Sequence, residues 1–101
     1  MELAKILIEQ YGYSPQAAAT TAEDLAALDE SVLPIFRAWQ EDRTESDATL
    51  FSGYSVDSLR EHYGMTFFSA LVTLDWIVKE PQSALQALRD GIKSSGNMSS
   101  P

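Results

Sequence analysis

Few residues of this chain carry side chains that could do acid–base chemistry near neutral pH. The single histidine, His62, follows Glu61, so a carboxylate lies beside the one imidazole that could exchange a proton there. A catalytic site would also need a nucleophile and an oxyanion-binding group, and no motif supplies them around this pair. The chain has no glycine-rich phosphate loop, His-Glu-x-x-His zinc motif or calcium-loop spacing. We therefore predict that the protein is not an enzyme and carries no cofactor.

Metal ligands are equally scarce. The chain has no cysteine, which excludes disulfides and thiolate metal sites. Asp42, Glu45 and Asp47 could attract a cation, but in a polar segment of a chain with one histidine they are typical of a solvated surface. We predict no metal site. The absence of disulfides from so small a chain favours the cytoplasm over an oxidising compartment.

Membrane insertion is not expected. The longest dense apolar stretch, residues 65–78, is interrupted by polar side chains and is shorter than the roughly 20 residues that span a bilayer. The N-terminal segment has neither a basic leader nor a small-residue cleavage site, so it does not read as a signal peptide.

The strongest compositional signal is negative charge. The net charge is −8; residues 1–50 hold ten acids against three bases, giving −7, and residues 51–101 hold five acids against four bases, giving −1. The first half would repel a phosphate backbone, because nucleic-acid affinity depends on neutralising phosphates with Lys and Arg. It would attract a protein with a basic surface. Acidity also keeps proteins soluble, so charge alone leaves both explanations open.

Apolar residues recur with helical spacing in six segments, and strand patterns are nearly absent. The expected helices begin near residue 2, at Ser14-Pro15, near Asp29 or Ser31, at Ser55, at Thr66 and at Pro81. The fifth, up to Val78, is apolar around most of its circumference, which is typical of a helix at the centre of a core. The sequence predicts an all-α fold of about six helices.

The chain resembles itself at an offset of 52 residues. Positions 3–40 then face 55–92 with nine identities in 38, and the helix-ending glycines Gly12 and Gly64 coincide. Duplication of a three-helix unit explains this, and so does the similar composition of two helical segments. We predict two tandem three-helix units sharing one core. The corresponding boundaries are 1–41 for the first unit, 42–54 for a linker, 55–93 for the second unit and 94–101 for a flexible tail.

The turn between the first two helices reads Tyr11-Gly12-Tyr13, and a capped helix and a short third helix follow it. In this arrangement residues 2–41 resemble the ubiquitin-associated (UBA) domain, a three-helix fold. Residues 55–92 resemble it more faintly. The sequence departs from the family pattern at Tyr11, where the family usually has an aliphatic residue, and the second copy lacks an aromatic after its glycine.

In the UBA family the loop and the end of the third helix form a small apolar patch that binds a partner. By position, the resemblance implies that Tyr11, Gly12, Tyr13 and Trp39 bind another protein. The alternative is that the two tyrosines pack the turn and Trp39 belongs to the core.

We therefore predict a non-enzymatic protein–protein interaction module whose partner is another protein with a basic surface. The alternative is an acidic antagonist of a basic partner, such as an antitoxin, an immunity protein or a nucleic-acid mimic. A helix-turn-helix DNA-binding regulator is less favoured. Its second helix would offer Phe67, Phe68 and Leu71 to the major groove in place of basic side chains. Homo-oligomerisation stays open.

Overall fold

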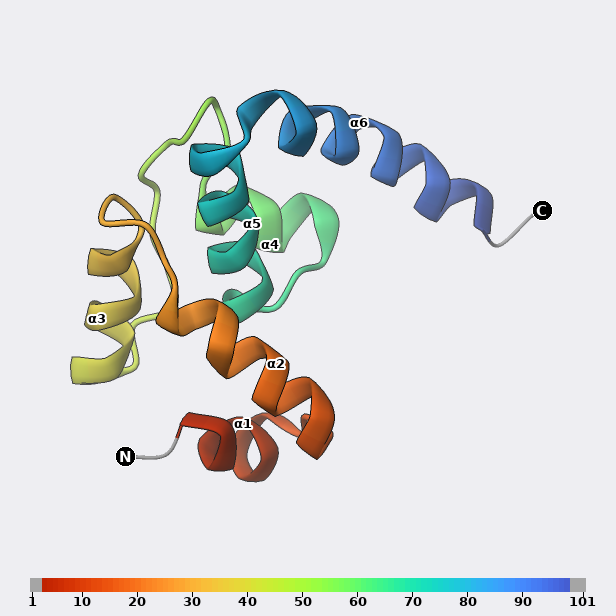
Figure 1. Cartoon of the computed structure of the whole chain (residues 1–101). Coiled ribbons are helices and arrows are strands. Elements are labelled where there is room, and N and C mark those ends of the chain that lie inside the picture. Colours follow the sequence, from red (N-terminus) through yellow and green to blue (C-terminus); the bar gives the residue numbers. More distant parts are fainter. Residues whose placement is uncertain (1–2, 99–101) are drawn as a thin grey trace.

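The computed structural model describes residues 3–98, with side chains up to residue 90, and within that range it contains six α-helices and no β-strand. In chain order these are α1 (Leu3–Tyr11), α2 (Pro15–Ala26), α3 (Leu33–Asp42), α4 (Val56–Tyr63), α5 (Phe67–Lys79) and α6 (Pro81–Met98). The helix α5 contacts α2, α4 and α6 and lies between α2 and α6 in Figure 1. The predicted all-α fold is confirmed.

Three helices begin at the predicted side-chain caps. Ser14, Ser55 and Thr66 have extended backbones, and each hydroxyl accepts a hydrogen bond from the backbone N–H three residues later. Such bonds satisfy N–H groups that have no partner inside the helix. At the start of α4, the hydroxyl of Ser58 accepts a hydrogen bond from the Ser55 N–H and completes a capping box.

The helix α3 begins later than predicted, at Leu33. The Asp29 carboxylate accepts hydrogen bonds from the backbone N–H and the hydroxyl of Ser31, and the Asp29 N–H donates to Asp75 of α5. The backbone bond and then the hydroxyl bond from Ser31 hold the pKa of Asp29 below its ordinary value. This local turn therefore attaches the α2–α3 connection to α5, and it does not form the first turn of α3.

The core is one cluster of buried side chains to which all six described helices contribute. The largest contribution comes from α5, with Phe67, Phe68, Ala70, Leu71, Leu74 and Ile77. The prediction that this helix is the centre of the core is confirmed. Its coverage is incomplete, however, since Trp76 and Val78 are each 37% exposed.

The two helix–turn–helix segments α1–α2 and α4–α5 have matching turns at the 52-residue spacing. Gly12 and Gly64 both have left-handed backbones, with φ of 75° and 68°. In the first turn the N–H of Tyr13 donates to the carbonyl of Leu7 over 3.0 Å. In the second turn the N–H of Met65 donates to the carbonyl of Leu59 over 3.4 Å. The third helices match less well, because the offset carries α3 to residues 85–94 whereas α6 begins at Pro81. Duplication of a whole three-helix unit stays a prediction.

The last helix, α6, extends away from the other helices toward the C-terminus (Figure 1). It ends at Met98 and so includes part of the 94–101 segment that we expected to be a tail. Residues 99–101 lie outside the described residues, and flexibility of the tail stays a prediction. Neither α6 nor any other helix in the described range is both long and apolar enough to cross a bilayer.

Candidate functional site

Two of the four predicted binding residues, Tyr11 and Trp39, are joined by a hydrogen bond. The indole N–H of Trp39 donates to the Tyr11 hydroxyl over 3.1 Å, and that hydroxyl donates to the Glu45 carboxylate over 2.7 Å. The Trp39 ring stacks on Phe36 at 5.7 Å, and the Arg43 guanidinium lies 4.5 Å from its centroid. Burial, followed by the bond to Glu45, raises the pKa of Tyr11 above its ordinary value.

The turn residues converge on Phe68 of α5. The rings of Tyr11, Trp39 and Tyr13 meet the Phe68 ring edge to face, with centroids 5.0, 5.1 and 6.3 Å away. The Tyr13 hydroxyl also lies 3.1 Å from the hydroxyl of Thr66, the residue that caps α5. The first turn is therefore fastened to the start of α5, with its aromatic side chains in fixed orientations.

Solvent reaches only part of this group. Gly12 is exposed, Tyr11 and Tyr13 are partly buried, and Trp39 is 0% exposed. Both the ring and the N–H group of Trp39 have their partners inside the protein. The structure thus places Trp39 in the core, as the alternative interpretation expected, and only the turn itself keeps surface for a contact.

The side chains considered for acid–base or metal chemistry do not form a site. His62 and Glu61 are exposed, and neither side chain makes a hydrogen bond or ion pair with the described residues. The carboxylates of Asp42 and Asp47 accept bonds from residues two positions later, and Glu45 binds Tyr11 and Arg60. Across the described side chains no three His, Asp or Glu residues are grouped as metal ligands.

Much of the negative charge of the first half is exposed and has no counter-charge. Among the described side chains, five exposed carboxylates of this half make neither a hydrogen bond nor an ion pair: Glu9, Glu23, Asp24, Glu30 and Glu41. We call these residues the acidic surface. The bases Lys5 and Arg37 are also exposed and unpaired, which leaves a clear excess of negative charge.

Most of the acidic surface lies at helix ends where the helix dipole makes negative charge unfavourable. Four of its carboxylates lie in the last turn of α1, α2 or α3, and these helices have no acid in the first turn and no base in the last. The C-terminal end of a helix carries partial negative charge, so an acid there is unfavourable. Two bases from outside those turns bind nearby carbonyls: Lys79 binds that of Ala27, and Arg43 binds that of Trp39. These two bases give hydrogen-bond partners to backbone carbonyls, but the acidic side chains remain without an ion pair.

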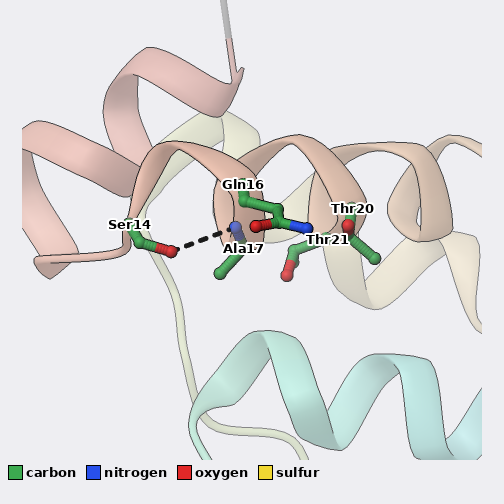
Figure 2. Close-up of a pocket in the computed structure, with 5 residues that line it drawn as sticks. All are labelled: Ser14, Gln16, Ala17, Thr20 and Thr21. Atoms are coloured by element: carbon green, nitrogen blue, oxygen red, sulfur yellow. Dashed lines mark hydrogen bonds between the residues drawn. The ribbon is translucent and has the colours of Figure 1, made fainter.

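Two open hollows on the described part of the surface have no catalytic motif in their lining. An open hollow of about 400 Å³ on α2 is lined by Ser14, Gln16, Ala17, Thr20 and Thr21 (Figure 2). None of these side chains titrates near neutral pH. The Ser14 hydroxyl accepts the Ala17 N–H over 3.2 Å as the cap of α2. A second open hollow, of about 490 Å³, is lined by Ser46, Asp57, Arg60, Glu61, Gly64 and Met65.

The geometry of α5 does not suit a DNA-recognition helix. Phe67, Phe68 and Leu71, the residues that would enter the major groove, are buried in the core. Lys79 is the one base on this helix, and it forms an ion pair with Asp75 over 3.1 Å. No basic face is therefore left on α5 for a phosphate backbone.

The residues that hold the 43–55 segment were not found from the sequence. Glu45 binds Tyr11 of α1 and Arg60 of α4, and Asp57 binds Ser46. Glu45 stands in a run of similar polar residues, and no spacing rule distinguishes it from its neighbours. Comparison with known proteins adds no relative, because no family model, curated protein or solved structure matches this chain.

Proposed function

We propose that this protein is a non-enzymatic interaction module of the cytoplasm that binds a protein with a basic surface through its acidic surface. The observation that supports the proposal is the group of exposed, unpaired carboxylates on the first three helices and, at Glu30, on the connection between α2 and α3. Four of them lie near helix C-termini, where negative charge is unfavourable in the free protein. A basic partner would supply the missing counter-charge and speed association by attraction over distance.

The turn at Tyr11, Gly12 and Tyr13 has a smaller part in this proposal. Its rings are fixed by Phe68, so contact with a partner would require little further ordering of side chains. The resemblance to the UBA domain supports a protein contact at this position. Trp39 would not contact the partner, because it has no exposed surface; it would hold Tyr11 in position through its hydrogen bond to the Tyr11 hydroxyl.

The acidic antagonist is a narrower version of the same proposal. In that case the basic surface of the partner would be the surface with which the partner performs its own function, and binding would block it. The two versions therefore differ in their effect on the partner: an antagonist abolishes the partner's activity, and a simple module leaves it unchanged.

The proposal is tested by capturing partners from the native cell with wild-type protein and two matched variants. Glu23→Gln/Glu30→Gln removes two charges from the acidic surface, and Glu80→Gln/Asp90→Asn removes two from the second half. We expect the first variant to bind the purified partner roughly tenfold more weakly at low salt, since each exposed ion pair contributes up to about 1 kcal/mol. The second variant should bind like wild type. Equal binding by all three proteins contradicts the proposal.

A further inference from the structure

The most exposed large apolar side chain among those described is Leu50, at 67%. The next most exposed, Ile8, Trp76 and Val78, are each at 37%. Leu50 lies in the 43–55 segment, thirteen residues without a helix that connect α3 to α4. Connections longer than about twelve residues are uncommon in compact domains and are often functional.

The backbone next to Leu50 forms a tight hairpin turn. Phe51 and Tyr54 exchange two backbone hydrogen bonds, of 2.7 and 3.0 Å, and the residues between them both have positive φ, 52° at Ser52 and 90° at Gly53. These features match a type I′ turn. Phe51 and Tyr54 are partly buried and pack against the core, whereas Leu50, one position earlier, is exposed. Neighbouring residues in an extended segment alternate in direction, which explains the contrast.

The start of the segment is fastened to the helices on both sides. Glu45 accepts the Tyr11 hydroxyl of α1 over 2.7 Å, and its backbone carbonyl accepts Arg60 of α4 over 2.8 Å. Further along, the Asp57 carboxylate accepts the Asp47 N–H over 2.9 Å. A single exposed leucine on a mobile loop would need no explanation. Here the backbone on both sides of Leu50 is held by hydrogen bonds within the protein, so binding would require little further loss of entropy.

The part of the sequence that contains Leu50 is acidic. From residue 41 to residue 61 the chain holds six acids and two bases, giving −4, which is half of the whole net charge. One of the two bases, Arg60, lies 3.6 Å from Glu45 and is already paired. A second copy of this chain would be repelled by the same charges, whereas a surface rich in Lys and Arg would be attracted.

We propose that residues 43–55 form a preformed docking loop, with Leu50 entering an apolar pocket on the partner and the acids of residues 41–61 meeting a basic rim. This inference rests on the proposed function, since it assigns the apolar contact for the same basic partner. Affinity at such surfaces is concentrated in a few anchored apolar residues, and charges at the rim mainly set the rate of association.

The test uses a library of short random peptides, selected against the wild-type protein at low salt. The selected peptides are then measured against Leu50→Ser and against Ala48→Ser, a control at another exposed position of the loop. We expect peptides that combine an apolar residue with several Lys or Arg residues. They should bind Leu50→Ser about tenfold more weakly than wild type, bind Ala48→Ser normally, and weaken as salt rises.

Two other results overturn the inference, and they differ in what they say of the proposed function. Basic peptides whose salt-sensitive binding is unaffected by Leu50→Ser exclude the docking loop but leave the acidic surface as the binding site. Failure to select any peptide, or selection of peptides without an excess of bases, contradicts both proposals. Leu50 is exposed, so its replacement is not expected to unfold the protein, and matching melting curves of the variants verify this.

Discussion

The hydroxyl group of Tyr11 connects three separate parts of the chain. It accepts the Trp39 N–H from α3 and donates to Glu45 of the 43–55 segment, while its own ring packs against Phe68 of α5. Trp39 is fully buried, and its N–H is paired with this hydroxyl. A buried donor without a partner is costly, so stability should depend on this single oxygen atom.

The change Tyr11→Phe tests this dependence. It keeps the ring contacts and removes both hydrogen bonds, which leaves the Trp39 N–H buried without an acceptor. We expect a loss of about 1–3 kcal/mol in the free energy of unfolding, measured by urea denaturation. Tyr13→Phe is the control, because its hydroxyl bond is exposed, and it should change stability by less than about 0.5 kcal/mol. Equal effects of the two changes would show that the Tyr11 hydroxyl has no special role.

A second tyrosine predicts how stability depends on pH. Burial, followed by interaction with Tyr54, raises the pKa of Tyr63 from 10.0 to about 12. The folded state therefore holds this proton more tightly than the unfolded state. The resulting stability is fully present below about pH 10 and is lost as pH rises from 10 through 12.

Denaturation midpoints measured across this pH range test the effect. Wild-type protein should lose stability between pH 10 and 12, and Tyr63→Phe should lose less over the same interval. Tyr13→Phe also removes one phenol but keeps Tyr63, so it should retain the loss. Parallel curves for wild type and Tyr63→Phe would contradict the assignment to Tyr63.

Among the helices, α5 is the one on which the others pack. It contacts α2, α4 and α6, and the ring of its Phe68 meets those of Tyr11 in α1 and Trp39 in α3. Its Asp75 and Lys79 bind the connection between α2 and α3. Loss of packing on this helix should therefore affect both halves of the molecule together, as one cooperative unit.

The changes Leu71→Ala and Leu74→Ala measure this packing. Both side chains are 0% exposed, and we expect each change to lower the free energy of unfolding by about 2–5 kcal/mol. Val78→Ala lies on the same helix at 37% exposure and should cost less than about 1 kcal/mol. Losses below about 1 kcal/mol for both leucines would show that α5 is not the centre of the core.

The sequence was sufficient where local chemistry decides the outcome. The starts of α2, α4 and α5 were predictable because a hydroxyl cap and the following N–H groups lie within three residues. The start of α3 was not, because Asp29 bonds to Asp75, a contact between residues 46 positions apart. The 43–55 segment likewise depends on hydrogen bonds to α1 and α4, and the spacing of apolar residues in the sequence does not predict such contacts.

The candidate site shows the same division. The aromatic–Gly–aromatic turn was recognisable because Gly12 has a left-handed backbone that favours glycine. The sequence left open whether Trp39 lies in the core or in a binding surface, since a helical pattern places an apolar residue on a face without saying what covers that face. Whether a tryptophan near a helix end belongs to a core or to an interface depends on the packing of the whole molecule.

For the whole molecule, the main property to explain is a net charge of −8 that its own bases do not balance. The ion pairs among the described residues, Arg60–Glu45 and Lys79–Asp75, do not involve the acidic surface and leave it unpaired. Four of the acids of that surface lie in the last turns of α1, α2 and α3, where the partial negative charge of the helix end makes an acid unfavourable. If they serve a partner, removing them should weaken binding without weakening the fold.

The most direct test measures both quantities in Glu23→Gln/Glu30→Gln: the free energy of unfolding, and the dissociation constant for the captured partner across a salt series. Our account predicts a variant at least as stable as wild type, with weaker binding at low salt and a smaller loss of affinity as salt rises. A variant that binds the partner as tightly as wild type, with the same salt dependence, would contradict the claim that the acidic surface is the binding site.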